Sequence, residues 1–186
     1  MPSSIPQRPT AFTLVEVALA LAVMGLIGAM TFPLLSHLLN QQKVARTETI
    51  LETARGEALG FALNTFTLPE SIAHFGHQTD GWGTELIYEK AAISDLCAFF
   101  DGTESPVLLQ INLPQGRTIE HVAVVLISLG RNRSPDTEYA PETGTITVRA
   151  PGEEINGKRS DDLLVYITSD FLRSKVWERC PVAPEN

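Results

Sequence analysis

The hydrophobic pattern divides the chain into an apolar segment, an amphipathic segment and a mixed remainder. Residues 12–35, FTLVEVALALAVMGLIGAMTFPLL, contain a single charged residue, Glu16. A helix of about 20 apolar residues is long enough to cross the hydrocarbon core of a bilayer. Its internal hydrogen bonds also satisfy the backbone, as a lone segment in lipid requires. The pattern therefore predicts one transmembrane helix over residues 12–35.

Residues 36–66 alternate between apolar and polar positions at helical spacing. The apolar positions are Val44, Leu51, Ala54, Ala58 and Ala62, and charged residues fall mostly between them. One apolar stripe with charges opposite is typical of a helix that packs one face on a domain. We expect the helix to continue from the span to about residue 66. Gly56 and Gly60 would then allow close packing between this helix and a sheet.

The remainder, residues 67–186, predicts a β-rich domain. Residues 67–77 contain Pro69 and show no hydrophobic periodicity, which indicates a loop. Five segments with strand character follow, at residues 85–88, 107–113, 122–128, 144–148 and 162–168. With no helical pattern between them, the strands are expected to form an antiparallel sheet of four or five strands packed on the long helix. The predicted fold class is α+β.

Composition narrows the function classes. The net charge of −8 lies entirely in residues 67–186, because residues 1–66 hold four basic and four acidic residues. An acidic domain repels nucleic acid backbones, so no nucleic acid partner is expected. The sequence also contains no nucleophile elbow, Walker-type phosphate loop or dinucleotide fingerprint. These observations favour a protein that is not an enzyme.

Two cysteines, Cys97 and Cys180, offer one disulfide candidate. An even number of cysteines in a domain outside the cytoplasm favours a bridge, and two separate buried thiols are the alternative. Neither cysteine has the C-x-x-C spacing of a metal or redox site.

The N-terminal region resembles the signature of type IV pilins and type II secretion pseudopilins. Eleven mostly polar residues end in Ala11, and Phe12, Thr13, Leu14, Val15 and Glu16 then open the apolar run. Pro33 falls where pilin helices often carry a proline. The resemblance implies that a prepilin peptidase cuts between Ala11 and Phe12 and methylates the new amino group. The family nearly always has glycine before the cut, so Ala11 implies slower cleavage.

The resemblance also gives Glu16 a function in assembly. A carboxylate in lipid costs several kcal/mol unless it is paired, and Glu16 could pair with the Phe12 amine of a neighbouring subunit. The partners implied are other pilin-like subunits, the prepilin peptidase, an inner-membrane assembly platform and membrane lipid. Lys43 and Arg46 follow the span and Arg8 precedes it, so charge gives no clear orientation. The resemblance implies a cytoplasmic N-terminus.

A second resemblance concerns three short motifs of the domain. Residues 80–83, DGWG, are similar to the D-x-W-G motif of pseudopilins. Residues 128–130, SLG, and residues 161–163, DDL, resemble the S-x-G turn and the acidic strand start that follow that motif. The tryptophan ring is expected between the helix and the sheet. In major pseudopilins the C-terminal loop binds calcium. The carboxylates available here are Asp136, Glu138, Asp161 and Asp162. Arg131 and Arg133 in the same loop disfavour a cation, so we expect no cofactor.

Together these features predict four segments: a prepilin leader at 1–11, a transmembrane helix at 12–35, its amphipathic continuation at 36–66, and a periplasmic domain at 67–186. The function implied is a structural subunit, a minor pilin or pseudopilin, of a type IV pilus or type II secretion filament. It would reside in the bacterial inner membrane until it is assembled. The alternatives are a major pseudopilin with a calcium loop and a single-span membrane-anchored enzyme or binding domain.

Overall fold

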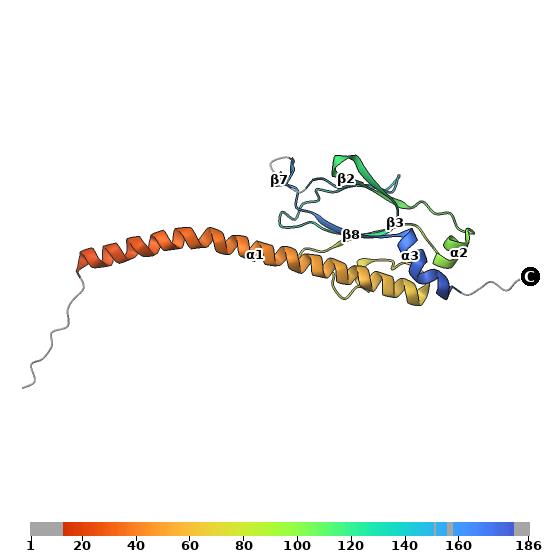
Figure 1. Ribbon diagram of the computed structural model, residues 1–186, viewed down its shortest axis with the longest axis horizontal. Coiled ribbons are helices and arrows are strands. Elements are labelled where there is room, and N and C mark those ends of the chain that lie inside the picture. The colour runs from red at the N-terminus through yellow and green to blue at the C-terminus, as the bar shows by residue number, and fades with distance from the viewer. Residues whose placement is uncertain (1–12, 151, 156–157, 181–186) are drawn as a thin grey trace, which may run out of the picture. The chain divides into compact units, whose positions relative to one another are not determined.

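The structure is a computed structural model that describes residues 13–150, 152–155 and 158–180. Its longest element is helix α1, Leu14–Thr65, which contains Pro33 (Figure 1). The chain divides into two compact units, residues 1–42 and residues 43–186. Helix α1 ends within one residue of the predicted boundary. An α+β chain with a long apolar N-terminal helix followed by a sheet is therefore confirmed.

The second unit contains the C-terminal part of α1, two short α-helices, three 3₁₀ helices and eight strands among the described residues. The helices are α2 (Leu96–Asp101), α3 (Ser169–Val176), η1 (Ile72–His74), η2 (Pro114–Gly116) and η3 (Trp177–Arg179). The strands are β1 (Ile87–Lys90), β2 (Leu109–Leu113), β3 (Arg117–Ser128), β4 (Glu138–Ala140), β5 (Thr145–Thr147), β6 (Glu154–Ile155), β7 (Lys158–Arg159) and β8 (Leu163–Thr168).

The main sheet has the order β1-β3-β2-β5-β4, and β8 also pairs with β3. All five predicted strands are present. Strands β2 and β5 run parallel, so the purely antiparallel sheet predicted from the sequence is wrong at this pair. The expectation of no helices between the strands is also wrong, because α2 lies between β1 and β2, and a further helix, α3, follows β8. These helices have six and eight residues, too short for a clear period.

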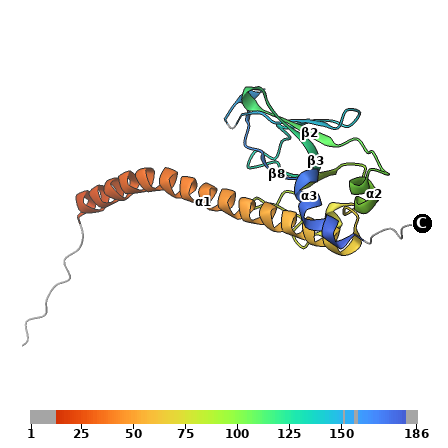
Figure 2. The same cartoon turned by 45° about the vertical axis from the view of Figure 1, so that its right-hand side comes forward.

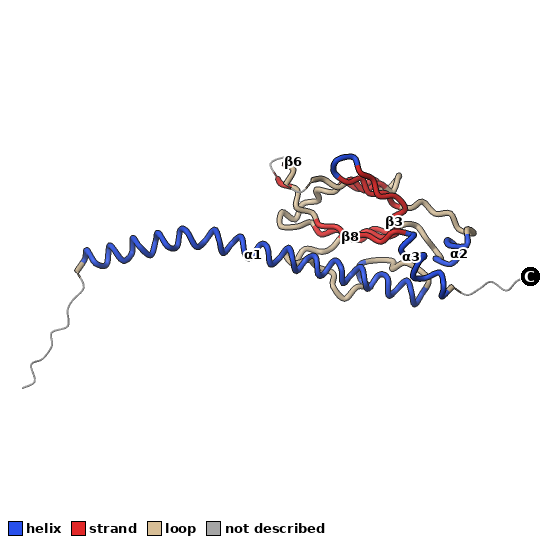
Figure 3. The backbone as a smooth tube through the Cα atoms, viewed as in Figure 1, coloured by secondary structure: helices blue, strands red, loops and turns tan. Residues whose placement is uncertain are grey.

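Strand β3 is shared by two layers of the sheet (Figures 1 and 3). Its first half pairs with β2, and its second half lies between β1 and β8. The pairings with β2 and β8 both shift register near Val122, and the preceding His121 has a φ of +58°. An irregularity of this kind bends a strand and increases its twist. The bend carries β3 from one layer into the other.

The core lies on both sides of the second half of β3. Residues 122–127 are all at most 2% exposed. A strand covered on both faces is a continuous apolar run, as the sequence indicated. One face meets α1 through a stripe at the predicted helical spacing, in which Leu51, Ala54, Ala58 and Ala62 are buried. The fifth predicted position, Val44, is only half-buried and lies outside the core cluster. In the turned view of Figure 2, α3 and α2 lie at the end of the sheet near the C-terminal part of α1.

Two packing predictions differ from the structure. A Cβ placed on Gly56 or Gly60 meets no atom within 4 Å, so these glycines do not provide close helix packing. The Trp82 side chain is only half-buried and lies outside the core cluster. The close approach is made instead by Gly81, whose added Cβ would lie 2.5 Å from the Lys43 carbonyl oxygen of α1.

Candidate functional site

The first candidate is the start of helix α1, where Glu16 caps its own helix. Its Oε2 accepts hydrogen bonds from the Thr13 backbone N–H at 2.8 Å and from the Thr13 hydroxyl at 2.9 Å. The Thr13 hydroxyl accepts in turn from the Glu16 N–H at 3.3 Å. This reciprocal pattern is a capping box, T-x-x-E. Among the described residues, no basic side chain forms an ion pair with Glu16.

The surface of this part of α1 is apolar. Apart from Met30, whose side chain lies outside the described part, its large hydrophobic side chains from Leu14 to Leu39 are 46–86% exposed. A contiguous apolar surface of this extent is rare on soluble monomers. The helix is long and apolar enough to span a membrane. The predicted cleavage site, Ala11 and Phe12, lies outside the described residues.

The second candidate lies in the domain, where the three short motifs meet around Asp80. The Asp80 side chain is 5% exposed. Its Oδ1 accepts from the backbone N–H groups of Trp82 at 2.8 Å and Thr84 at 2.9 Å. Its Oδ2 accepts from the Ser128 hydroxyl at 2.7 Å. Asp80 thus shapes its own turn and ties that turn to the end of β3.

The same turn is joined to helix α1. The Gly81 N–H donates to the Thr47 hydroxyl at 2.9 Å, and Thr47 is fully buried. The Thr47 hydroxyl donates to the Lys43 carbonyl at 2.9 Å. A side chain at position 81 would overlap this part of the helix, so glycine is required by contact with the helix backbone.

The end of β3 is joined to the acidic residues before β8 through Gly130. The Gly130 N–H donates to the Ser128 hydroxyl at 3.2 Å. Its φ is +63°, and a Cβ there would lie 2.4 Å from the Asp161 carbonyl oxygen. Both the backbone angle and the lack of space therefore demand glycine.

Three of the four predicted calcium candidates come together beside this turn. One carboxylate oxygen from each of Asp136, Asp161 and Asp162 lies within 4.8 Å of the others. Asp161 Oδ2 accepts from the backbone N–H groups of Arg131 at 2.8 Å and Asn132 at 3.3 Å. These bonds hold Asp161 against the loop that follows β3.

The other two carboxylates hold the far end of that loop. Asp162 Oδ2 accepts from the Asp136 N–H at 2.9 Å, and from the N–H and hydroxyl of Thr137 at 2.8 Å each. Asp136 Oδ2 accepts from the Asn132 side-chain amide at 2.8 Å and the Asp161 N–H at 3.2 Å. The three carboxylates thus organise residues 131–137.

The cluster has the donor chemistry of a hard-cation site. Oδ1 of Asp161 and Oδ1 of Asp162 are enclosed and accept no hydrogen bond among the described residues. Burial raises the pKa of both carboxyl groups, and the nearby Asp136 charge raises it further. Carboxylate oxygens are ligands that calcium takes, in sets of about six to eight oxygens. Asp136, Asp161 and Asp162 would supply part of such a set.

The fourth candidate, Glu138, does not join the cluster, because its side chain pairs with Arg149. The two arginines expected to oppose a cation, Arg133 and Arg131, interact with different groups. Arg133 donates through its guanidinium to the Trp82 carbonyl at 3.2 Å, which ties it to the Asp80 turn. Arg131 lowers the pKa of Asp161 through its charge, although this effect is smaller than that of burial.

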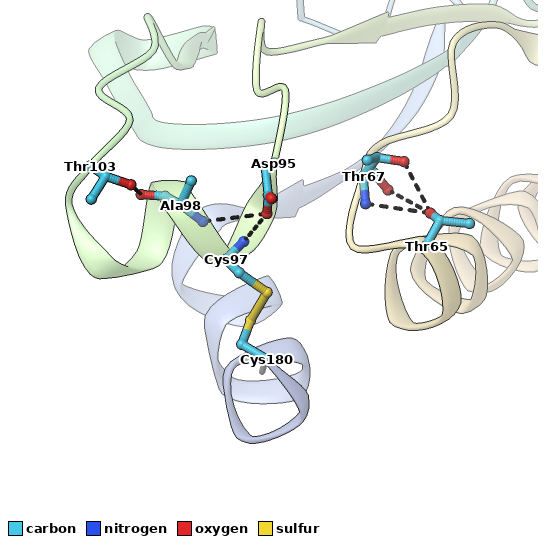
Figure 4. Close-up of a disulfide and its surroundings, with 7 residues drawn as sticks. All are labelled: Thr65, Thr67, Asp95, Cys97, Ala98, Thr103 and Cys180. Atoms are coloured by element: carbon cyan, nitrogen blue, oxygen red, sulfur yellow. Dashed lines mark hydrogen bonds between the residues drawn. A yellow bond between two sulfur atoms is a disulfide. The ribbon is translucent and has the colours of Figure 1, made fainter. Parts of the chain in front are cut away.

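The cysteines form a disulfide that ties the C-terminal end of the described chain to α2 (Figure 4). The Cα atoms of Cys97 and Cys180 are 5.6 Å apart, and the residues are 83 positions apart in sequence. Asp95 caps α2 by accepting from the N–H groups of Cys97 at 2.7 Å and Ala98 at 3.3 Å. The cap fixes the first turn of the helix from which the Cys97 side chain projects.

Sequence reasoning missed two residues that build these sites. Thr13 could have been found, since T-x-x-E before an apolar run predicts a capping box. Thr47 could not, because a threonine within an amphipathic helix carries no mark of its distant partner, Gly81.

Comparison with known proteins gave no match: no family model, no curated protein and no solved structure is significantly similar to the chain.

Proposed function

We propose that this protein is a structural subunit, a minor pilin or pseudopilin, of a type IV pilus or type II secretion filament. The observation that carries the proposal is the exposed apolar N-terminal part of α1, residues 14–35, whose single carboxylate, Glu16, lies in the first turn of the helix. Such a surface requires lipid or other helices as its surroundings. In this proposal the chain is not an enzyme. It is held in the bacterial inner membrane with its domain in the periplasm until assembly.

On assembly, the apolar helix would leave the lipid of the membrane and pack against the helices of other subunits. Cleavage after Ala11 exposes an amine on Phe12, and Glu16 of a neighbouring subunit neutralises it, so that two charges costly in lipid satisfy each other. The capping bonds from Thr13 do not compete fully with this pairing, because they use Oε2 and leave Oε1 for a second donor. The apolar helices would form the filament core, and the domains would face outward.

Processing is tested by the N-terminus and intact mass of the full chain, purified from membranes of cells that carry a prepilin peptidase. The expected product begins at N-methylated Phe12. Ala11→Gly should be processed faster, since glycine is the family's residue at this position. A chain that still begins at Met1 in both forms would contradict the proposal and favour a simple membrane-anchored enzyme or binding domain.

Assembly is tested with variants that separate the two functions of Glu16. Glu16→Gln keeps an acceptor for the capping box but has no charge to offer an amine. Thr13→Ala removes the hydroxyl from the cap and leaves the charge. We expect Glu16→Gln to abolish cross-linking into filaments with co-expressed subunits, and Thr13→Ala to retain it. Normal cross-linking of Glu16→Gln, with both variants inserted in the membrane, would overturn the charge-pairing mechanism.

The enclosed oxygens of Asp161 and Asp162 favour a second candidate function, a major pseudopilin with a calcium loop. Calcium would be held by these residues and Asp136, and it would supply a fixed positive charge that makes the loop rigid. The test is thermal unfolding of the full chain in detergent with calcium or magnesium. Calcium should raise Tm, and Asp162→Asn should remove the effect while Glu138→Gln retains it. An unchanged Tm would exclude the calcium-binding candidate, and the minor subunit would be the remaining proposal.

A further inference from the structure

Three strands of the described sheet pair along one edge only: β1, β4 and β8. Natural proteins protect such edges with charges, proline or short length, because unpaired backbone groups attract other strands. Strand β1 carries Glu89 and Lys90, and β4 has three residues and begins with Glu138. Strand β8 has six residues, LLVYIT, with neither charge nor proline. Its edge is the unprotected one among them.

The outer edge of β8 borders a groove in the domain. Among the described residues, no backbone hydrogen bond joins β8 to any segment other than β3. The groove has a volume of about 330 Å³ and is lined by five consecutive residues of β8, residues 164–168, together with Glu52 and Arg55 of α1 and Phe171 of α3. Tyr166 is 37% exposed there. A continuous strand edge along a groove has the form of a site for strand addition.

Two cations lie close to the Phe171 end of the groove, although the protein carries a net charge of −8: Arg55 lines the groove, and Lys175 lies beside the same ring without lining it. Arg55 lies 5.7 Å from the centre of the Phe171 ring, and the Lys175 ammonium lies 5.8 Å from it. Glu52 pairs with Arg55 at 3.1 Å and offsets one of these two charges. The end at Phe171 therefore complements an acidic group on an occupant.

We propose that β8 is a docking edge for an extended strand of a partner polypeptide, which adds to the sheet through backbone hydrogen bonds and places an acidic residue beside Arg55 and Phe171. Backbone pairing would supply affinity, and the charge would set the position of the strand. The proposal does not depend on filament assembly, because it rests on the domain alone.

Binding is tested by fluorescence anisotropy with the full chain in detergent micelles. The probe is a labelled hexapeptide, Val-Thr-Val-Thr-Val-Glu with an amidated C-terminus. Two further probes replace Glu with Lys, or the central Val with Pro. The Glu peptide should bind about 5-fold tighter than the Lys peptide, as expected for one exposed charge pair. The Pro peptide should not bind, because proline lacks the donor that strand pairing uses.

The structure offers a matched pair of variants. Tyr166 on β8 and Tyr139 on β4 are both 37% exposed on edge strands. Tyr166→Lys should weaken binding of the Glu peptide at least about 10-fold, because an edge lysine opposes strand addition, and Tyr139→Lys should leave it unchanged. Arg55→Ala should remove the preference for Glu over Lys, with Arg46→Ala as the control. Equal unfolding temperatures would show that each variant is folded.

Several results would overturn the proposal. One is no binding of the Glu peptide at about 1 mM, and another is equal binding of the Pro peptide. Equal weakening by Tyr139→Lys would show that binding is not at β8. If the chain without peptide sediments as a dimer that Tyr166→Lys converts to a monomer, the occupant of β8 is a second copy.

Discussion

The Ser128 hydroxyl donates a hydrogen bond of 2.7 Å to Asp80 Oδ2, although the two residues are 48 positions apart in the sequence. Both side chains are buried, with exposed fractions of 0% and 5%. The bond joins the turn that contacts helix α1 to the turn that contacts the acidic cluster. Helix, sheet and cluster are thus linked through two short polar side chains.

Removing the Ser128 hydroxyl should destabilise the domain. In Ser128→Ala, Asp80 Oδ2 stays buried without its donor, and the Gly130 N–H loses its acceptor. A buried polar group left without a partner costs about 1–3 kcal/mol. The free energy of unfolding in urea should fall by that amount. Ser174→Ala removes an exposed hydroxyl that donates to Phe171 and should change it far less, so equal losses would contradict the importance of the Asp80 contact.

Replacing Gly130 should be more costly than replacing a glycine with similar backbone angles in open space. Gly130 has φ +63° and would bring a Cβ within 2.4 Å of the Asp161 carbonyl oxygen, whereas Gly102 has φ +87° and nothing within 4 Å. Gly102→Ala should therefore cost about 1 kcal/mol from backbone strain alone. We expect Gly130→Ala to exceed that loss clearly in thermal unfolding. Similar losses would mean that the Asp161 contact is easily relaxed.

Reduction of the disulfide should lower stability substantially. The bridge between Cys97 and Cys180 spans 83 positions. Closing a loop of that length in the unfolded chain is worth roughly 4 kcal/mol on the chain-entropy model. The double variant Cys97→Ser with Cys180→Ser should lose this stability, and a reductant should lower the Tm of the parent protein to the same value without affecting the variant. If the reductant lowers the Tm of the parent protein and of the double variant equally, the loss of stability does not come from this disulfide.

Glu104 should make stability depend on pH in the acid range. Its carboxylate accepts from the N–H groups of Ser94 at 2.7 Å and Asp95 at 3.1 Å, and these bonds hold the pKa of Glu104 below its ordinary value of 4.5. A group whose pKa is lowered by folding adds stability above its unfolded pKa, and this stability is lost as the pH falls through the folded pKa.

The measurement is the unfolding free energy of the parent protein minus that of Glu104→Gln between pH 7 and pH 3. The difference should be constant near neutral pH and shrink below about pH 4.5. Glu142→Gln, at an exposed position, is the control and should show no such trend. A constant difference across the whole range would exclude the linkage.

Regular patterns made part of the fold predictable. The apolar run of residues 12–35, the stripe that ends at Ala62 and the run 122–128 each have a period or length that reports burial directly. The structure confirms the long helix, the buried stripe from Leu51 to Ala62 and the five expected strands, whereas Val44 is not part of the core. The parallel pairing of β2 with β5 was not predictable, because strand direction depends on how the chain returns across the sheet.

The candidate sites likewise divide into features that the sequence predicted and features that only the tertiary structure determined. The sequence named Glu16, the two cysteines and four carboxylates, Asp136, Glu138, Asp161 and Asp162, as candidates, because their chemistry is visible in the residue type. Only the tertiary structure decided that Glu138 pairs with Arg149 instead of joining the cluster, and that a Cβ at Gly81 would collide with α1 while one at Gly56 would meet no neighbouring atom within 4 Å. Composition and local spacing specify what a residue can do, whereas contacts between residues dozens of positions apart depend on how the packed layers bring them together.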